Sequence, residues 1–118
     1  MKTERFAVRH ESVTLTAGQS NILIYKYELT IDHEIGFWEE MANTWVGLTY
    51  YEIYVDGKYF EKLERVMGEP ESPHRWKPPI VFKDSIVIYG TNNDSAPHVF
   101  EVILDGQIVD KRYMNEGS

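Results

Sequence analysis

The sequence predicts an all-β protein, an antiparallel β-sandwich of either jelly-roll or immunoglobulin-like topology. Three observations support this prediction. Short stretches rich in β-branched and aromatic residues recur along the chain, clusters of Gly, Asn, Asp and Ser separate them, and two of the separators are Asp-Gly pairs. The 118 residues include no cysteine and suffice for a single domain, residues 1–118, that folds without disulfides or metal.

The N-terminal third is expected to form three strands. Residues 6–8 and 13–16 are short β-rich stretches, and a turn is expected at residues 17–21. Residues 21–31 then carry apolar side chains at alternate positions, with polar residues between several of them. This period of two indicates a strand with one buried face. The apolar residues of that face are Leu23, Tyr25, Tyr27, Leu29 and Ile31.

Two segments depart from the strand pattern. Apolar residues in the segment 37–45 follow helical spacing, which predicts one or two helical turns, with an irregular loop as the alternative. Those residues are Trp38, Met41, Ala42 and Trp45. Residues 68–79 hold four of the five prolines, and proline cannot pair inside a sheet. This second segment is expected to be an extended loop that crosses between the two sheets.

Two hairpins and one further strand complete the predicted fold. An Asp-Gly pair between β-rich stretches favours a type I′ turn, because that turn needs positive φ at both central residues. Asp56-Gly57 is expected to join residues 50–55 to 58–63, and Asp105-Gly106 to join residues 99–104 to 107–110. Residues 85–89 form a compact β-branched strand that ends at a turn over residues 90–94.

Composition and motifs argue against several classes of function. The net charge of −7 leaves no large basic surface, so nucleic acid is not an expected partner. The four histidines are far apart and none has the spacing of a metal motif. The chain has no nucleophile elbow, phosphate-binding glycine loop or dinucleotide fingerprint. We therefore expect no catalytic residues, no metal and no cofactor.

The apolar stretches are too short for membrane insertion. No run approaches the roughly 20 residues that cross a bilayer. Residues 1–5 are not followed by an apolar segment of the kind found in signal peptides. Synthesis in the cytoplasm, without secretion by a signal peptide, is the expectation.

The first hairpin offers a candidate binding surface. A two-residue turn places residues opposite one another in the pairs Ile53 with Phe60, Tyr54 with Tyr59 and Glu52 with Glu61. The first pair is assigned to the core. The tyrosine pair and the two facing carboxylates share the other face, which is either open to water or covered by another chain. The tyrosines either shield the hairpin or bind a sugar or a neighbouring subunit.

The second hairpin and the proline-rich segment offer further candidates. The hairpin is apolar on both faces and so needs cover on both, from the segment with Trp38 or Trp76 or from a second subunit. One face is predicted to carry Phe100, Val102, Leu104 and Val109, and the other Val99, Ile103 and Ile108. Trp76 itself either closes one end of the sandwich or belongs to an arm that docks on a partner.

Residues 91–106, Thr-Asn-Asn-Asp-Ser-Ala-Pro-His-Val-Phe-Glu-Val-Ile-Leu-Asp-Gly, resemble the closing strands of small all-β proteins in tailed-phage and viral particles. The Tyr54-Val55-Asp56-Gly57 hairpin and the Pro78-Pro79-Ile80-Val81 stretch are compatible with that resemblance. The likeness covers about the last forty residues and carries no diagnostic motif. It implies a decoration, adaptor or attachment component without catalytic activity.

Two hypotheses of different classes follow. The first is a non-catalytic assembly module, with a virion as one setting, whose partner is a second copy or a protein scaffold. The second is a monomeric carbohydrate-binding module in which tyrosine or tryptophan side chains stack on sugar rings.

Overall fold

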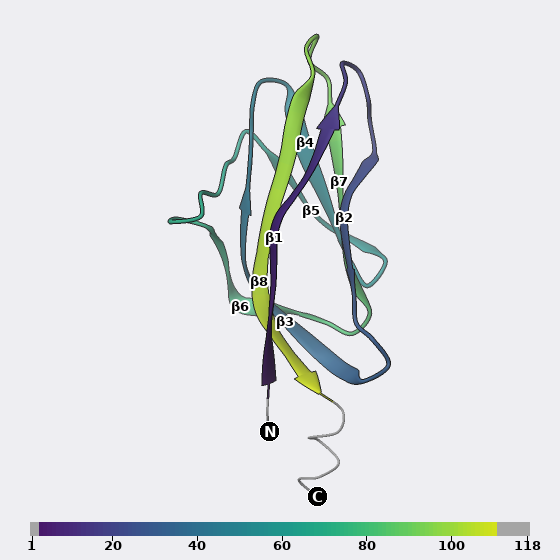
Figure 1. Cartoon of the computed structure of the whole chain (residues 1–118), viewed down its shortest axis with the longest axis vertical. Coiled ribbons are helices and arrows are strands. Elements are labelled where there is room, and N and C mark those ends of the chain that lie inside the picture. The colour runs from purple at the N-terminus through teal and green to yellow at the C-terminus, as the bar shows by residue number, and fades with distance from the viewer. Residues whose placement is uncertain (1–2, 111–118) are drawn as a thin grey trace, which may run out of the picture.

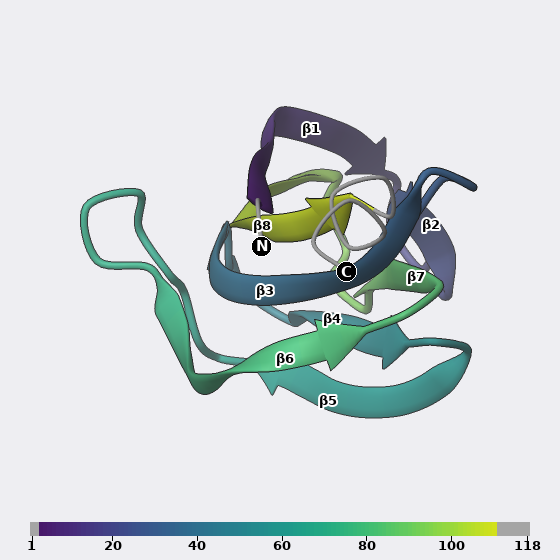
Figure 2. The ribbon, with the colours of Figure 1, turned by 90° about the horizontal axis from the view of Figure 1, so that it is seen from below.

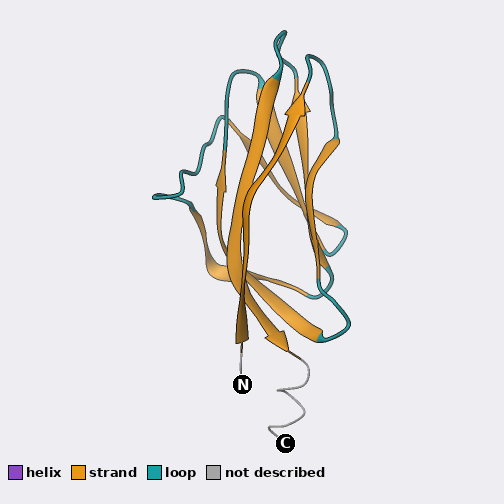
Figure 3. Cartoon of the chain, in the orientation of Figure 1, coloured by secondary structure: helices purple, strands orange, loops and turns teal. Residues whose placement is uncertain are grey.

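The computed structural model describes residues 3–110 and folds them into two four-stranded antiparallel sheets packed face to face (Figures 1 and 2). These residues include no helix (Figure 3), and therefore no helix long and apolar enough to cross a membrane. The strands are β1 (Thr3–Leu15), β2 (Ile22–Glu28), β3 (His33–Asn43), β4 (Thr49–Val55), β5 (Lys58–Glu64), β6 (His74–Phe82), β7 (Ser85–Asn92) and β8 (His98–Asp110).

The strand order is that of a jelly roll. One sheet has the order β1-β8-β3-β6 and the other β2-β7-β4-β5. β4 pairs with β5, β3 with β6, β2 with β7 and β1 with β8, so the chain behaves as one long antiparallel ribbon wrapped into two layers. Every connection except the β4–β5 turn crosses from one sheet to the other. The predicted β-sandwich is confirmed, and of the two topologies this pairing is the jelly roll.

The core lies between the sheets and is dominated by aromatic and branched side chains. Tyr51 is 1% exposed and packs edge to face on Phe100, with 5.2 Å between the ring centroids. Its hydroxyl lies 2.7 Å from the Thr44 hydroxyl, and burial raises the pKa of Tyr51 to about 12. The largest fully buried side chains are Trp38, Tyr51, Phe82 and Phe100.

The first predicted hairpin is confirmed. Asp56 and Gly57 have φ values of 52° and 80°, the positive values that a type I′ turn requires. The Asp56 carboxylate also accepts backbone N–H bonds from Lys83, Asp84 and Ser85 at 2.8 to 3.1 Å. The hairpin turn is therefore fastened to the β6–β7 connection.

The second predicted hairpin is wrong. Asp105 and Gly106 lie inside β8, a single strand that pairs with β1 on one side and β3 on the other. Gly106 stands opposite Phe6 in β1 and Trp38 in β3, and it is not among the positive-φ residues. The local preference of Asp-Gly for a turn is outweighed because a turn here would remove half of a central strand that pairs along both edges.

The predicted helical turn at residues 37–45 is also wrong. These residues belong to β3 and its C-terminal extension, and β3 has a bulge between Trp38 and Glu40. The extra residue, Glu39, makes the spacing between the buried residues Trp38 and Met41 three instead of two. A bulged strand therefore imitated the spacing of a helix.

The proline-rich segment divides into a loop and an edge strand. Residues 65–73 form a loop that extends from the side of the sandwich, whereas residues from His74 onward pair with β3, contrary to the expected loop (Figures 1 and 2). Pro78 and Pro79 lie in a bulge between the Trp38–Ile80 and Glu40–Arg75 pairs. An edge strand tolerates them because one of its sides needs no hydrogen-bonded partner.

Bulges also alter the N-terminal strands. Residues 6–8 and 13–16 belong mainly to the one strand β1, with a register shift between Val8 and Glu11. β2 ends at Glu28 and has a bulge between Leu23 and Tyr25, which places Ile24 in the core and leaves Leu23 47% exposed. Ile31, 87% exposed, lies beyond the strand, so neither Leu23 nor Ile31 belongs to the predicted buried face. β7 extends past the predicted residue 89 to Asn92.

Candidate functional site

The outer face of the β2-β7-β4-β5 sheet carries the candidate site. Ile53 of β4 and its partner Ile88 of β7 are fully buried against the other sheet. Because side chains alternate along a strand, the residues next to Ile53 in β4 and next to Ile88 in β7 point outward, away from the other sheet. Tyr54 thus lies on the outer face opposite Val87 of β7 and Tyr59 of β5.

Three tyrosines form a row across this face. The Tyr54 ring lies between those of Tyr59 and Tyr89, at centroid distances of 5.8 and 5.6 Å and interplanar angles of 82° and 90°. Edge-to-face packing of this kind holds each ring in a defined orientation. Tyr59 remains 55% exposed. We call this surface the tyrosine face and define it by Leu23, Lys26, Glu28, Tyr50, Glu52, Tyr54, Tyr59, Lys62, Glu64, Val87 and Tyr89.

A shallow hollow of about 430 Å³ opens on the tyrosine face. Tyr54, Tyr89 and Val87 line it, together with Asn21 and Gly57. Two aromatic rings and one amide are side chains suited to contact a flat partner surface or a sugar ring.

The charges on the tyrosine face nearly balance. Lys26 and Glu28 form an ion pair at 3.0 Å, and Lys62 and Glu64 form one at 3.5 Å. Lys62 also lies opposite Glu52 and 4.0 Å from the centre of the Tyr50 ring. Polar groups that already have partners on their own surface lose less when another surface covers them.

The expected Glu52–Glu61 pair does not form. A bulge at Phe60, next to the Tyr54–Tyr59 pair, shifts the β4–β5 register by one residue, so Glu52 faces Lys62 and Glu61 faces Ile53. Glu61 therefore lies outside the tyrosine face. The turn fixed the first two pairs of the hairpin, but the bulge at Phe60 could not be foreseen from the turn.

Phe60 and Trp76 close the side of the sandwich between β5 and β6. Phe60, 42% exposed instead of buried as expected, packs edge to face on Trp76 at 5.8 Å. Trp76 in turn packs on Trp38 at 5.2 Å and stacks on His74. Its buried indole N–H has no acceptor among the described residues. Trp76 is thus half-buried in an aromatic cluster that belongs to the sandwich itself.

The β8 candidates fall on opposite sides of the other sheet. Val99 is 48% exposed and Ile103 half-buried, both on the outer face, whereas Ile108 is 4% exposed and belongs to the core. The placement of Ile108 with Val99 depended on a turn at Asp105-Gly106. In one continuous strand, Ile108 alternates in step with Phe100, Val102 and Leu104 and points inward.

One end of the sandwich holds a histidine–carboxylate pair. His98 Nε2 lies 2.9 Å from Asp94 Oδ2, and this bond lowers the pKa of Asp94. No hydroxyl is hydrogen-bonded to His98 among residues 3–110. Among the side chains that the structure describes, no three of His, Asp or Glu gather as metal ligands would.

No protein-family model matches the chain, and no curated protein matches it at a significant level of similarity.

Three residues of the tyrosine face, Tyr54, Tyr59 and Glu52, were predicted from the sequence, whereas Tyr89 was not. The available signal was the alternation of residues 85–89, in which Val87 and Tyr89 share one side.

Proposed function

We propose that this protein is a non-catalytic assembly module that acts through protein–protein contacts, and that its tyrosine face binds a second copy of the chain. The observation that carries the proposal is the ordered row of Tyr59, Tyr54 and Tyr89 on an outer sheet face. Tyrosine is enriched at protein interfaces because it buries a large apolar ring while its hydroxyl finds a polar partner. Rings held by one another also lose little conformational freedom on association.

The charge distribution favours a second copy as the partner of this face. A molecule with a net charge of −7 repels copies of itself at most surfaces. The tyrosine face is an exception, since Lys26 and Lys62 largely offset its glutamates. A two-fold interface brings a surface against itself and so requires one that is self-complementary.

A virion is the setting that the sequence resemblance supports. Residues 91–106 resemble small all-β components of tailed-phage and viral particles. Such particles repeat the same protein many times, which fits a module that contacts copies of itself.

The proposal is tested by measuring absolute mass by light scattering coupled to size exclusion over a wide concentration range. We expect the wild-type chain to exceed its monomer mass of 13.8 kDa and the double variant Tyr54→Ser/Tyr59→Ser to return to it. Val99→Ser removes a comparably exposed side chain from the opposite sheet and should leave the mass unchanged. A wild-type chain that stays monomeric at every concentration would refute self-association.

Carbohydrate binding is the second candidate, and the hollow between Tyr54 and Tyr89 is the observation that favours it. Stacking on a sugar would use the tyrosine rings, and the Asn21 amide would hydrogen-bond a hydroxyl group. A glycan screen with the wild-type chain and a Tyr89→Ala variant separates this candidate from assembly. Glycan binding that is lost in Tyr89→Ala, by a chain that stays monomeric, would favour it.

A further inference from the structure

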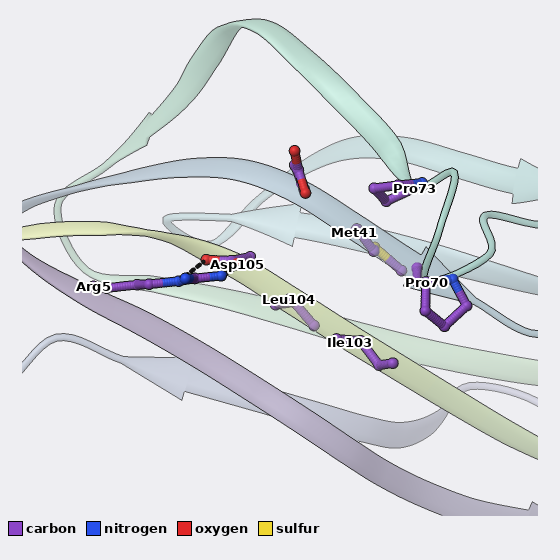
Figure 4. Close-up of a pocket in the computed structure, with 9 residues that line it drawn as sticks. Arg5, Met41, Pro70, Pro73, Ile103, Leu104 and Asp105 are labelled. Atoms are coloured by element: carbon purple, nitrogen blue, oxygen red, sulfur yellow. Dashed lines mark hydrogen bonds and ion pairs between the residues drawn. The ribbon is translucent and has the colours of Figure 1, made fainter.

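A groove lies on the other outer face of the molecule, between strands β3 and β8 and the loop at residues 65–73. Its central hollow holds about 260 Å³. In Figure 4, Pro70 and Pro73 of the loop stand on one side and Ile103 of β8 on the other, with the Arg5–Asp105 ion pair at one end. The loop thus forms one wall of the groove, and the sheet forms the other.

A second hollow of about 180 Å³ continues the groove and is mostly apolar. It shares Ala42, Pro70 and Ile103 with the first and adds Met67, which is 51% exposed. The loop at residues 65–73, which forms one wall of the groove, is held in place by Asn43, a residue that is 4% exposed.

Asn43 holds the loop by backbone and side-chain bonds. Its backbone N–H donates to Gly68 O at 2.9 Å, its amide donates to Val66 O at 3.0 Å, and its amide oxygen accepts from Gly68 N at 3.2 Å. The apolar hollow is therefore part of the fold and does not depend on a loosely attached loop.

The groove continues in the opposite direction toward β6. A third hollow shares Arg5, Glu40 and Asp105 with the first and adds Glu39. A fourth shares Glu39 and Glu40 with the third and reaches Trp76 at the bulge of β6. We call these four connected hollows the loop groove.

Among the residues whose side chains the structure describes, carboxylates outnumber cations along the loop groove. Its acidic residues are Glu39, Glu40, Glu69, Glu101 and Asp105, and its basic residues are Arg5, Arg75 and Lys77. Arg5 pairs with Asp105 through both carboxylate oxygens, and Arg75 pairs with Glu40 at 3.3 Å. In the part of the chain that the structure describes, Glu39, Glu69 and Glu101 form no ion pair.

We propose that the loop groove binds an extended segment of a partner protein in which Lys or Arg residues flank an apolar side chain. The apolar side chain would lie against Met67, Ala42 and Ile103, and the flanking cations would pair with Glu101 and Glu69 at one end and Glu39 at the other. This goes beyond the proposed self-association, because it assigns a different surface and a partner of opposite charge. The unbalanced carboxylates also set this groove apart from the tyrosine face, since two copies would repel each other here.

Fluorescence anisotropy with a matched pair of labelled peptides tests the groove. The probes are Lys-Leu-Arg-Leu-Lys and Glu-Leu-Glu-Leu-Glu, with a third peptide in which serine replaces both leucines of the basic one. We expect the basic peptide to bind, its affinity to fall as salt is raised, and the other two to bind weakly or not at all. The double variant Glu69→Gln/Glu101→Gln should bind it about tenfold more weakly, since each exposed ion pair contributes up to about 1 kcal/mol.

The control is Asp32→Asn/Asp84→Asn, which removes the same charge from exposed positions outside both the loop groove and the tyrosine face and should bind the basic peptide as the wild type does. Equal loss of affinity in both double variants would overturn the proposal, because net charge alone would then explain binding. Binding of the serine peptide as tightly as the leucine peptide would also overturn it. If Glu69→Gln/Glu101→Gln changed the solution mass of the protein, the occupant would be a second copy. Peptide binding and self-association use different surfaces. The peptide measurements therefore test the loop groove whether or not the wild-type chain self-associates through the tyrosine face.

Discussion

Two buried asparagines organise the loops at the residue scale. Asn43 ties the loop at residues 65–73 to the end of β3, and its amide oxygen lies 2.7 Å from His74 Nε2. Asn92, fully buried, donates to Leu15 O at 3.1 Å and Ala96 O at 2.9 Å. A buried amide with donor and acceptor both satisfied can replace a stretch of backbone pairing where strands end.

Replacing Asn92 with alanine should lower the free energy of unfolding by about 2 to 3 kcal/mol, because buried backbone carbonyls lose their donor. The adjacent Asn93 is exposed and provides the control, with a change below about 0.5 kcal/mol for Asn93→Ala. Urea unfolding monitored by tryptophan fluorescence measures both. Similar losses in the two variants would show that the buried hydrogen bonds of Asn92 contribute little.

His74 should make the stability depend on pH. Burial lowers its pKa in the folded chain, while the charge of Glu61 acts in the opposite direction. The unfolded chain, with a histidine pKa of about 6.5, then binds a proton more readily, so the free energy of unfolding falls as pH drops through about 6.5. Urea titrations between neutral pH and pH 5.5 should show a smaller fall for His74→Gln. An equal fall in both proteins would contradict this assignment.

At the scale of elements, the two Asp-Gly pairs show that one local signal has two outcomes. Asp56-Gly57 forms the turn at which the ribbon reverses, and the Asp56 carboxylate bonds to the β6–β7 connection. Asp105-Gly106 lies in a central strand, and Asp105 only pairs with Arg5 at the surface. The position of a pair in the sheet, and not its own preference, decides which structure it adopts.

The same change at the two aspartates should therefore have unequal effects. Asp56→Ala should lower the free energy of unfolding by about 2 kcal/mol, because the hydrogen bonds of Asp56 are lost and alanine is strained at positive φ. Asp105→Ala should lower it by less than about 1 kcal/mol, as expected for an exposed ion pair. Thermal or urea unfolding of the two variants gives the comparison. A larger loss for Asp105→Ala would argue for the turn that the sequence suggested.

Bulges set the limit of what the sequence could predict. Alternation and turn residues sufficed for the fold class, for the first hairpin and for the Tyr54–Tyr59 pair. A single extra residue at Glu39 or Phe60 changes which side chains face inward, and no local pattern marks these positions because partner strands impose them. The loop groove was likewise beyond prediction, since it joins residues 65–73 to β3 and β8 through contacts distant in sequence.

At the scale of the whole molecule, the jelly roll presents two outer faces with different properties. The β2-β7-β4-β5 sheet carries packed tyrosines and nearly balanced charge, which suits contact with a second copy. The β1-β8-β3-β6 sheet carries the acidic loop groove, which suits a basic segment of another protein. The two proposals together describe a module that joins copies of itself through one face and holds a different partner on the other.

The most direct test of the tyrosine-face contact is a distance between two copies. The chain has no cysteine, so Glu52→Cys places one spin label at the centre of the tyrosine face and Glu101→Cys places one on the opposite sheet. Face-to-face sheets lie about 10 Å apart, so dipolar spectroscopy should give roughly 10 to 25 Å for Glu52→Cys and more than about 30 Å for Glu101→Cys. Absence of any measurable distance at position 52, or a shorter distance at 101, would contradict self-association through the tyrosine face.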